Sequence, residues 1–177
     1  MMSKISTRMI AALTALFMCT AALAYLAWSA MAHQSAALQT TYADTVVPLR
    51  NLKIISDRYA VDIVDAAHKT RNGNFTPEQS LTAMKTALAE IDKLWTEFHT
   101  QPHAGAEAEL TKKAETQLAK ARKATLTLIG LVERKDIEAI ARFTVNDMYP
   151  AIDPGTEAIG ELIELQLAQA KDIALAA

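Results

Sequence analysis

The sequence predicts an all-α protein, an antiparallel up-down-up-down four-helix bundle preceded by a transmembrane helix. The 177 residues are rich in Ala and Leu and include only 5 Gly and 5 Pro, a composition that favours helices over sheets. Apolar residues recur every three or four positions over long stretches, which is the period of one helix face. Short breaks containing Gly or Pro separate these stretches, and short loops between long helices make neighbouring helices antiparallel.

The first predicted element is a transmembrane helix over residues 9–31. These residues carry no charged side chain, and about 20 apolar helical residues suffice to cross a bilayer. Lys4 and Arg8 come just before them, so the positive-inside rule places residues 1–8 in the cytoplasm. We therefore expect this helix in the inner membrane and residues 32–177 in the periplasm.

A cleaved signal peptide is the alternative interpretation of the N-terminus. Ala30, Met31 and Ala32 match an A-x-A cleavage site. The apolar core of a signal peptide is usually only 7–15 residues long, so the longer stretch here favours an uncleaved anchor. The alternative function is an anchored or secreted helical binding protein without a signalling role, which cleavage after Ala32 would favour.

The first bundle helix is predicted from Tyr42 to the pair Asn72-Gly73, which suits a left-handed helix stop. It is expected to continue without interruption from the membrane helix. Its apolar stripe consists of Tyr42, Val46, Leu49, Leu52, Ile55, Tyr59, Ile63 and Ala66. Apolar residues off this stripe predict a contact with a second copy of the chain. They are Val47, Ile54, Val61 and Val64.

The second helix is predicted to begin at Thr76, with Pro77 in its first turn and Gln79 completing a capping box. Its seam alternates strictly by three and four residues, as in packed bundles. The seam residues are Leu81, Met84, Leu88, Ile91, Trp95 and Phe98. Residues 101–105 form the next break.

The third helix is predicted from about Glu107 to Glu133, and the fourth helix follows a turn at residues 134–136. Pro150 and Pro154 fall inside the fourth helix. Because proline lacks an N–H and crowds the preceding turn, we expect a kink or a local unwinding there.

Several segments resemble the periplasmic sensory domain of bacterial methyl-accepting chemotaxis receptors. They are YADTVVPLRNLK at 42–53, DRYAVDIVDAAHKTRNG at 57–73, Trp95, MYPAIDP at 148–154 and LIELQL at 162–167. The resemblance covers nearly all of residues 5–177. It implies a homodimeric four-helix-bundle sensor that binds a ligand near the membrane-distal dimer interface and signals across the inner membrane.

The resemblance also suggests ligand-binding residues, of which Arg58 matches the first ligand arginine of the aspartate-sensing members. The next two arginine positions hold Ile63 and Ala67, which argues against aspartate. On the fourth helix the family places a ligand-contacting threonine near Arg142, Thr144 and Tyr149, where either Thr144 or Val145 aligns with it. The alternatives are a surface charge for Arg58, a small seam residue for Thr144 and a core aromatic for Tyr149.

Arginine and hydroxyl groups at these positions suit a carboxylate, because the guanidinium offers planar paired donors. We therefore expect a small organic acid as ligand, such as a di- or tricarboxylate or a hydroxylated cyclic or aromatic acid.

Other functions find little support in the sequence. No nucleophile–base pattern and no phosphate loop occurs, so we do not expect an enzyme, and no cofactor is predicted. His99 and His103 have a metal-like spacing, but Pro102 breaks the helix between them, so no metal site is predicted. The net charge of −2 argues against binding nucleic acid. Cys19 is the single cysteine, so no disulfide can form within one chain.

Overall fold

The computed structural model describes residues 2–41 and 45–176. Within these ranges the chain is almost entirely helical and contains no strand, which confirms the predicted all-α class. The chain divides into two units, Met1–Asp44 and Thr45–Ala177, and each is described by itself.

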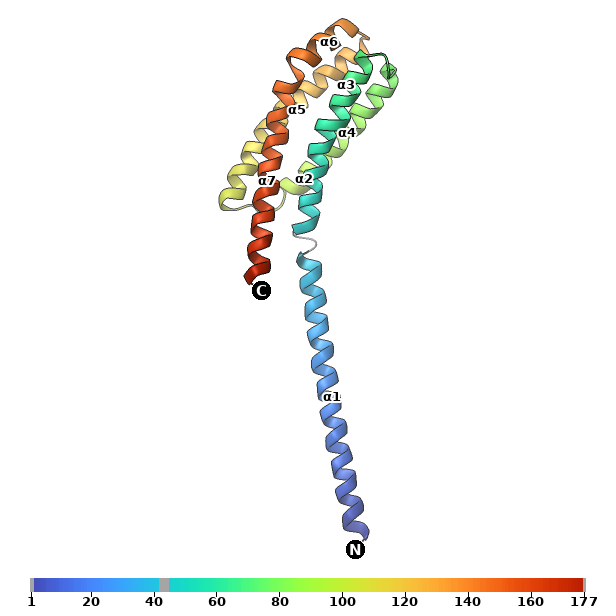
Figure 1. Cartoon of the computed structure of the whole chain (residues 1–177), viewed down its shortest axis with the longest axis vertical. Helices are drawn as coiled ribbons and strands as arrows, with labels where there is room; N and C mark the ends of the chain where they lie inside the picture. The colour runs from blue at the N-terminus through green and yellow to red at the C-terminus, as the bar shows by residue number, and fades with distance from the viewer. Residues whose placement is uncertain (1, 42–44, 177) are drawn as a thin grey trace. The chain divides into compact units, whose positions relative to one another are not determined.

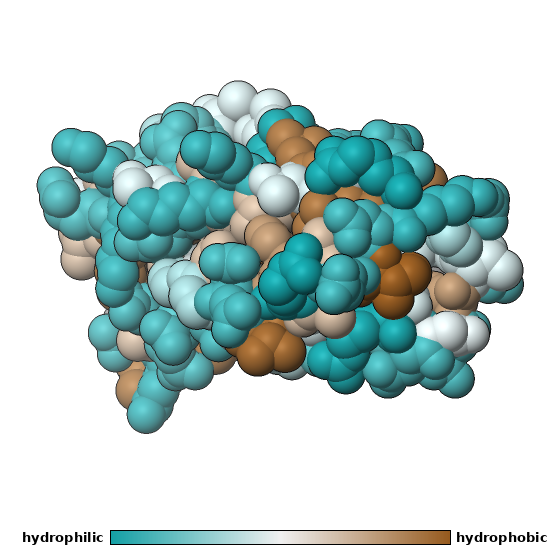
Figure 2. All heavy atoms as spheres, turned by 90° about the horizontal axis from the view of Figure 1, so that it is seen from above, coloured by the Kyte–Doolittle hydropathy of each residue, from teal (hydrophilic) through white to brown (hydrophobic). Residues whose placement is uncertain are grey.

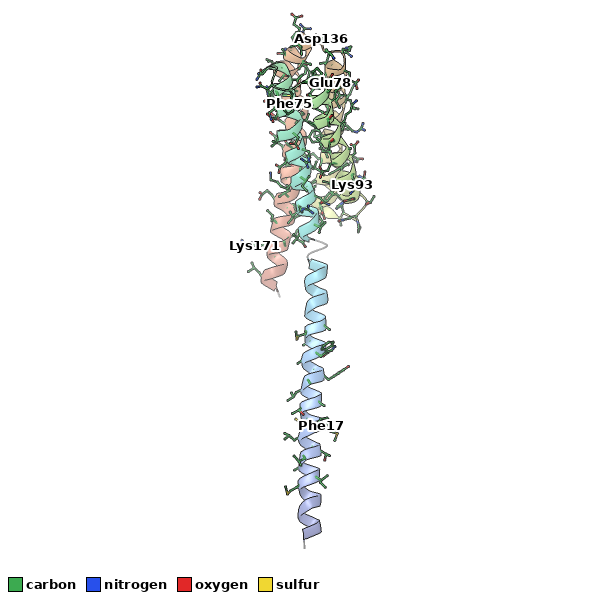
Figure 3. The ribbon with its side chains drawn as sticks, turned by 90° about the vertical axis from the view of Figure 1, so that its right-hand side faces the viewer. Phe17, Phe75, Glu78, Lys93, Asp136 and Lys171 are labelled. Carbon is green, nitrogen blue, oxygen red and sulfur yellow. The ribbon has the colours of Figure 1, made fainter. Side chains whose placement is uncertain are left out.

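The first unit is the single helix α1, Met2–Thr41. Its stretch Ala12–Ala32 is long and apolar enough to cross a membrane, and a signal sequence would meet the same description. Large apolar side chains along it, such as Phe17 (Figure 3), are exposed. The stretch overlaps the predicted range 9–31. The expected helical continuation through 42–44, including Tyr42, lies outside the described residues.

The second unit is the bundle (Figure 1). Its elements in chain order are α2 (Val47–Asp57), η2 (Arg58–Ile63), α3 (Val64–Arg71), α4 (Pro77–His99), α5 (Gly105–Glu133), α6 (Ile137–Asn146) and α7 (Met148–Ala176). The first three run on from one another as one long helix, called here the first helix. It packs against α4, α4 packs against α5, and α7 packs against both α5 and α2. This ring of contacts confirms the up-down-up-down bundle.

The predicted stripes form most of the core. On the first helix, Leu52, Ile55, Tyr59 and Ile63 are almost fully buried, while Val46 at its start is exposed. The predicted seam of α4 is buried or packed against the core over its whole length. Since burial of one such side chain contributes roughly 1.5–3 kcal/mol, these stripes hold the four helices together.

The segment η2 is one turn of π-helix within the first helix. Ile55, Tyr59 and Ile63 follow one another at steps of four residues. In an α-helix each such step overshoots a full turn by about 40°, so Ile63 would leave the core face. The wider π turn absorbs this drift, and all three residues stay buried.

The predicted ends of the first helix and α4 agree with the structure. Gly73 has φ +74°, the left-handed conformation that glycine adopts without steric cost. The Thr76 hydroxyl accepts a hydrogen bond from the Gln79 backbone N–H at 3.2 Å, and the Gln79 side chain accepts one from the Thr76 N–H at 2.9 Å. The capping box is therefore formed as predicted.

The interruption of the last helix lies just before the two prolines. Helix α6 ends at Asn146, Asp147 is a turn residue, and α7 starts at Met148. Pro150 cannot donate a hydrogen bond to the Asn146 carbonyl and its ring would crowd that oxygen, which explains the break. Pro154 remains inside α7.

Candidate functional site

Three exposed residues follow one another along α6 and the start of α7. Arg142, Val145 and Tyr149 are spaced by three and four positions, and the exposed fractions of Val145 and Tyr149 are 68% and 41%. The Arg142 side chain is 63% exposed, and its Nη1 lies 3.7 Å from a carboxylate oxygen of Glu138. An ion pair this long and this exposed contributes little to stability. The guanidinium is therefore accessible to a ligand.

Tyr149 is joined to the first helix through His68. The Tyr149 hydroxyl and Nε2 of His68 are 2.8 Å apart, and the two ring centroids are 6.0 Å apart. This bond links α3 to the first turn of α7. His68 was not among the predicted site residues, because no periodicity in the sequence relates residues 81 positions apart.

Arg58 faces α4. Its Nε donates to Glu90 at 2.7 Å and its Nη1 donates to Asp62 at 2.5 Å. The hydrogen bond with Asp62, and then that with Glu90, raise the pKa of Arg58 above its usual value. Two carboxylates thus offset one positive charge, and an anionic ligand gains less from Arg58 than from an unpaired arginine.

A groove of about 350 Å³ lies beside Arg58, between the first helix and α4. The Nζ of Lys69 bonds Asp65 at 2.6 Å and lies 4.8 Å from the centroid of the Phe75 ring. The charged groups are therefore paired with each other. The lining residues are Arg58, Asp62, Asp65, Ala66, Lys69, Phe75, Thr82, Ala83, Thr86 and Ala87.

Thr144 lies inside the bundle. Its side chain is fully buried, and its hydroxyl donates to the Ile140 carbonyl at 2.6 Å. Arg142 on α6 and Tyr149 at the start of α7 are thus exposed, and Tyr149 is bonded to His68. Arg58 instead faces α4, and Thr144 lies inside the bundle.

The four off-stripe apolar residues of the first helix do not form one outer edge. Val61 is exposed, but Val64 is buried and Ile54 packs partly against the core. The π turn accounts for the burial of Val64, because its wider winding brings this residue toward the core beside Ile63. Val61 is therefore the most exposed apolar residue of this set.

The His68–Tyr149 pair lies toward the end of the bundle that carries residues 72–76 and 134–136, called here the Gly73 end. Phe75, Glu78 and Asp136 mark this end in Figure 3. Figure 2 looks onto it and shows hydrophilic side chains interrupted by small apolar areas. The Gly73 end is opposite to the end at which the bundle begins with Thr45 and at which α7 ends (Figure 1).

Comparison with known proteins identifies a family and a relative. The family model described as a four helix bundle sensory module for signal transduction matches residues 2–177. The methyl-accepting chemotaxis protein NahY of Pseudomonas putida is 35% identical over 167 residues, which make up 94% of this chain and 31% of that protein. The chain thus spans about a third of the length of this relative. No solved structure matches the chain.

The matched family is one of signal-transduction modules and not of enzymes. The family model matches nearly the whole chain, and the structure over this range consists of the apolar helix α1 and the helical bundle. The chain belongs to the family of four-helix-bundle sensory modules for signal transduction and is homologous to a methyl-accepting chemotaxis protein.

Proposed function

We propose that this chain is the sensory part of a transmembrane chemoreceptor, with α1 anchored in the inner membrane and the bundle in the periplasm. The homology to a methyl-accepting chemotaxis protein supports a role in chemotaxis. The length and composition of Ala12–Ala32 support the anchor. Lys4 and Arg8 before this stretch support the orientation.

The proposed ligand is a small organic acid, such as a di- or tricarboxylate or a hydroxylated cyclic or aromatic acid. The observation that carries this proposal is the accessible guanidinium of Arg142, seven positions before Tyr149, which is itself bonded to His68. A guanidinium binds a carboxylate through two parallel hydrogen bonds. The phenol and the imidazole would then orient the hydroxyl or second carboxyl group of the acid.

Arg58 and Thr144 have different parts in this proposal. Arg58 lies on the α4 side of the first helix. In the proposed dimer it would therefore contact an acid that is bound by a second copy of the chain. Thr144 would support the site indirectly, because its bond to the Ile140 carbonyl holds the turn that carries Arg142.

The proposed homodimer places the exposed Val61 and Val145 in its contact. Both are apolar and exposed in the single chain, and burying them against a second copy would remove apolar surface from water. A ligand held between two copies would strengthen the dimer by mass action. Sedimentation of the chain in detergent, with and without acid, measures this. A monomer under both conditions would eliminate the shared site.

A thermal-shift screen of the full chain in detergent micelles tests the ligand class. An acid at a hundred times its dissociation constant should stabilise the bundle by about 2.7 kcal/mol. Amino acids are included in the screen as control compounds. Failure of every acid to raise the melting temperature would contradict the proposed class while leaving the family assignment intact.

Variants of two arginines test the site itself. Arg142→Ala should weaken binding of the acid by about one to two decades, since a hydrogen bond to a charged group contributes about 1.5–3 kcal/mol. Arg142→Lys should restore binding only in part, because lysine lacks the planar fork. Arg122→Ala is the matched control, because Arg122 bonds Asp92 between α4 and α5 and is not part of the proposed site.

A further inference from the structure

The exposed faces of α5 and α7, two helices that pack side by side (Figure 1), carry charges of opposite sign. On α5 three exposed lysines form what is called here the basic stripe: Lys112, Lys120 and Lys123. On α7 three exposed carboxylates form the acidic stripe: Asp153, Glu157 and Glu164. The spacing within each set keeps its members on one face of the helix. Solvated surfaces usually mix both signs, so the separation of the two signs is unusual.

The charges of the two stripes are not paired within the bundle. Among the side chains that the structure describes, none of the six takes part in an ion pair. Lys120 donates only to the amide oxygen of Gln117, at 3.2 Å. The neighbouring Lys113, by contrast, is paired with Glu161 of α7 at 2.6 Å. The two stripes are therefore available to charges from outside the bundle.

Three contacts between α5 and α7 show which residues of the two helices are level with each other. They are Lys113–Glu161 at 2.6 Å, Glu107–Gln166 at 2.9 Å and Leu118 beside Gly155. Because the helices are antiparallel, each step along α5 matches one step back along α7.

The two stripes have the same spacing along the bundle axis. The α5 positions that are level with Asp153, Glu157 and Glu164 each come about three residues, or about 4.5 Å, before a lysine of the basic stripe. The corresponding lysines are, in order, Lys123, Lys120 and Lys112. A single small shift along the axis thus brings every carboxylate level with a lysine.

We propose that the basic stripe of α5 docks against the acidic stripe of α7 in a second copy of the chain. This proposal rests on the anchor and the orientation proposed above, because copies inserted in one membrane in the same direction hold equivalent residues at equal height. The long lysine side chains can span the shift of about 4.5 Å. Three ion pairs then form together, and such complementary charges fix the register of an interface.

Residues beside the stripes fit the same register. Leu126 of α5 is 45% exposed, and the shift that aligns the stripes also brings it level with the exposed Pro150 of α7. Nearer the other end of the stripes the sign reverses on both helices, with Glu109 on α5 and Lys171 on α7. Figure 3 shows Lys171 projecting from α7. In this register Glu109 and Lys171 are about one helical turn apart, so these exceptions are complementary too.

The proposed contact joins two different surfaces and is therefore heterologous. Each copy uses its α5 toward one neighbour and its α7 toward the other, so further copies extend the assembly into a row or close it into a ring. The proposed homodimer contact, which contains Val61 and Val145, involves neither stripe. Exposed ion pairs are weak and are screened by salt, but anchoring in a membrane raises the effective concentration of the copies.

Cross-linking of the full chain in phosphatidylcholine vesicles tests this proposal. A zero-length carbodiimide joins an amine to a carboxylate that it contacts, and mixing isotope-labelled with unlabelled chains identifies the links between copies. We expect Lys123–Asp153, Lys120–Glu157 and Lys112–Glu164 to be linked between copies, in products larger than a dimer. Their yield should fall by about tenfold in 1 M NaCl, where the Debye length is about 3 Å.

Charge reversal supplies the matched variants. Reversal of the basic stripe (Lys112→Glu, Lys120→Glu and Lys123→Glu) should abolish the links, because like charges then face each other. Reversal of the acidic stripe (Asp153→Lys, Glu157→Lys and Glu164→Lys) should do the same. A mixture of the two variants should restore the links, because each variant presents the stripe that the other lacks.

The control variant reverses three exposed basic residues on the first helix and α4, with Arg50→Glu, Lys53→Glu and Lys93→Glu. It should be linked like the unchanged chain. The proposal is overturned if no links form between copies, if 1 M NaCl leaves them unchanged, or if the mixed variants stay unlinked. If a reversed variant does not fold, the salt dependence and the identity of the linked residues still decide. Release of the unchanged chain from the vesicles would instead contradict the proposed anchor, so the two failures are distinguishable.

Discussion

Tyr149 and His68 are joined by a 2.8 Å hydrogen bond that links the first turn of α7 to α3 across 81 positions of the sequence. The bond lies immediately after the interruption between α6 and α7. It therefore fixes the start of α7 against the first helix at the point where the α6–α7 backbone is least regular.

The strength of this bond can be measured by a double-mutant cycle. Tyr149→Phe and His68→Ala should each destabilise the chain, and their coupling free energy should be about 0.5–1.5 kcal/mol, the usual net contribution of a hydrogen bond. Chemical denaturation of the two single variants and the double variant gives the value. A coupling free energy of zero would mean that the pair does not form in solution.

Arg58→Ala should affect stability slightly and ligand affinity moderately. Its ion pairs with Asp62 and Glu90 are more than one-third exposed, and pairs of this kind contribute only about 0–1 kcal/mol. The affinity for the acid should fall less than in Arg142→Ala, because the two carboxylates offset the charge of Arg58. Titration calorimetry beside thermal melts separates the effects, and an affinity equal to that of the unchanged chain would remove Arg58 from the site.

The same substitution at two glycines should have opposite effects. A Cβ at Gly73 would meet no atom within 4 Å, but the residue has φ +74°, so Gly73→Ala should destabilise by about 1–2 kcal/mol through backbone strain. A Cβ at Gly160 also meets nothing within 4 Å, and this residue lies inside α7. Gly160→Ala should stabilise by up to about 1 kcal/mol. Urea denaturation of both variants checks this, and a change of the same sign in both would contradict it.

Glu78 should make the stability of the chain sensitive to acid. Three interactions lower the pKa of Glu78 below its usual value. The largest is the hydrogen bond from its own backbone N–H, followed by the hydrogen bond with the Thr76 side chain and by the positive charge of Lys135. A lowered pKa in the folded state means that the carboxylate stabilises the fold above the usual pKa, and that this contribution is lost as pH falls through the folded-state pKa.

The difference in denaturation midpoint between the unchanged chain and Glu78→Gln should therefore be largest near neutral pH and should shrink toward pH 3. Urea titrations at several pH values between about 3 and 7 measure this. Glu164→Gln controls for the removal of an exposed carboxylate elsewhere, on α7. A midpoint difference that grows on acidification would contradict the assigned direction of the pKa shift.

The N-terminus should remain attached to the bundle. We expect mass spectrometry of the membrane-extracted protein to find residues 1–32 intact, because the apolar stretch is longer than the core of a typical signal peptide. A mature N-terminus at His33 would instead support cleavage after Ala32 and a secreted binding protein. Proteolysis of spheroplasts, with the bundle degraded from the periplasmic side, checks the orientation.

The sequence by itself determined the helical class, the order of the helices and most of their ends. These features depend on local physics: the 3.6-residue period, the left-handed conformation available to Gly73, the capping box at Thr76 and the missing N–H of Pro150. It also placed Arg142 and Tyr149 near one another, because the two are less than two helical turns apart along the chain.

Only the tertiary structure decided which way the remaining residues face. Periodicity shows which residues share a helix face, but it does not show which neighbour that face meets. The π turn at residues 58–63 changes the rotation of the first helix partway along. This rotation and the packing of the bundle direct Arg58 toward Glu90 and His68 toward Tyr149. Contacts between residues this far apart in sequence depend on the rotation of each helix against its neighbours, which no single helix specifies.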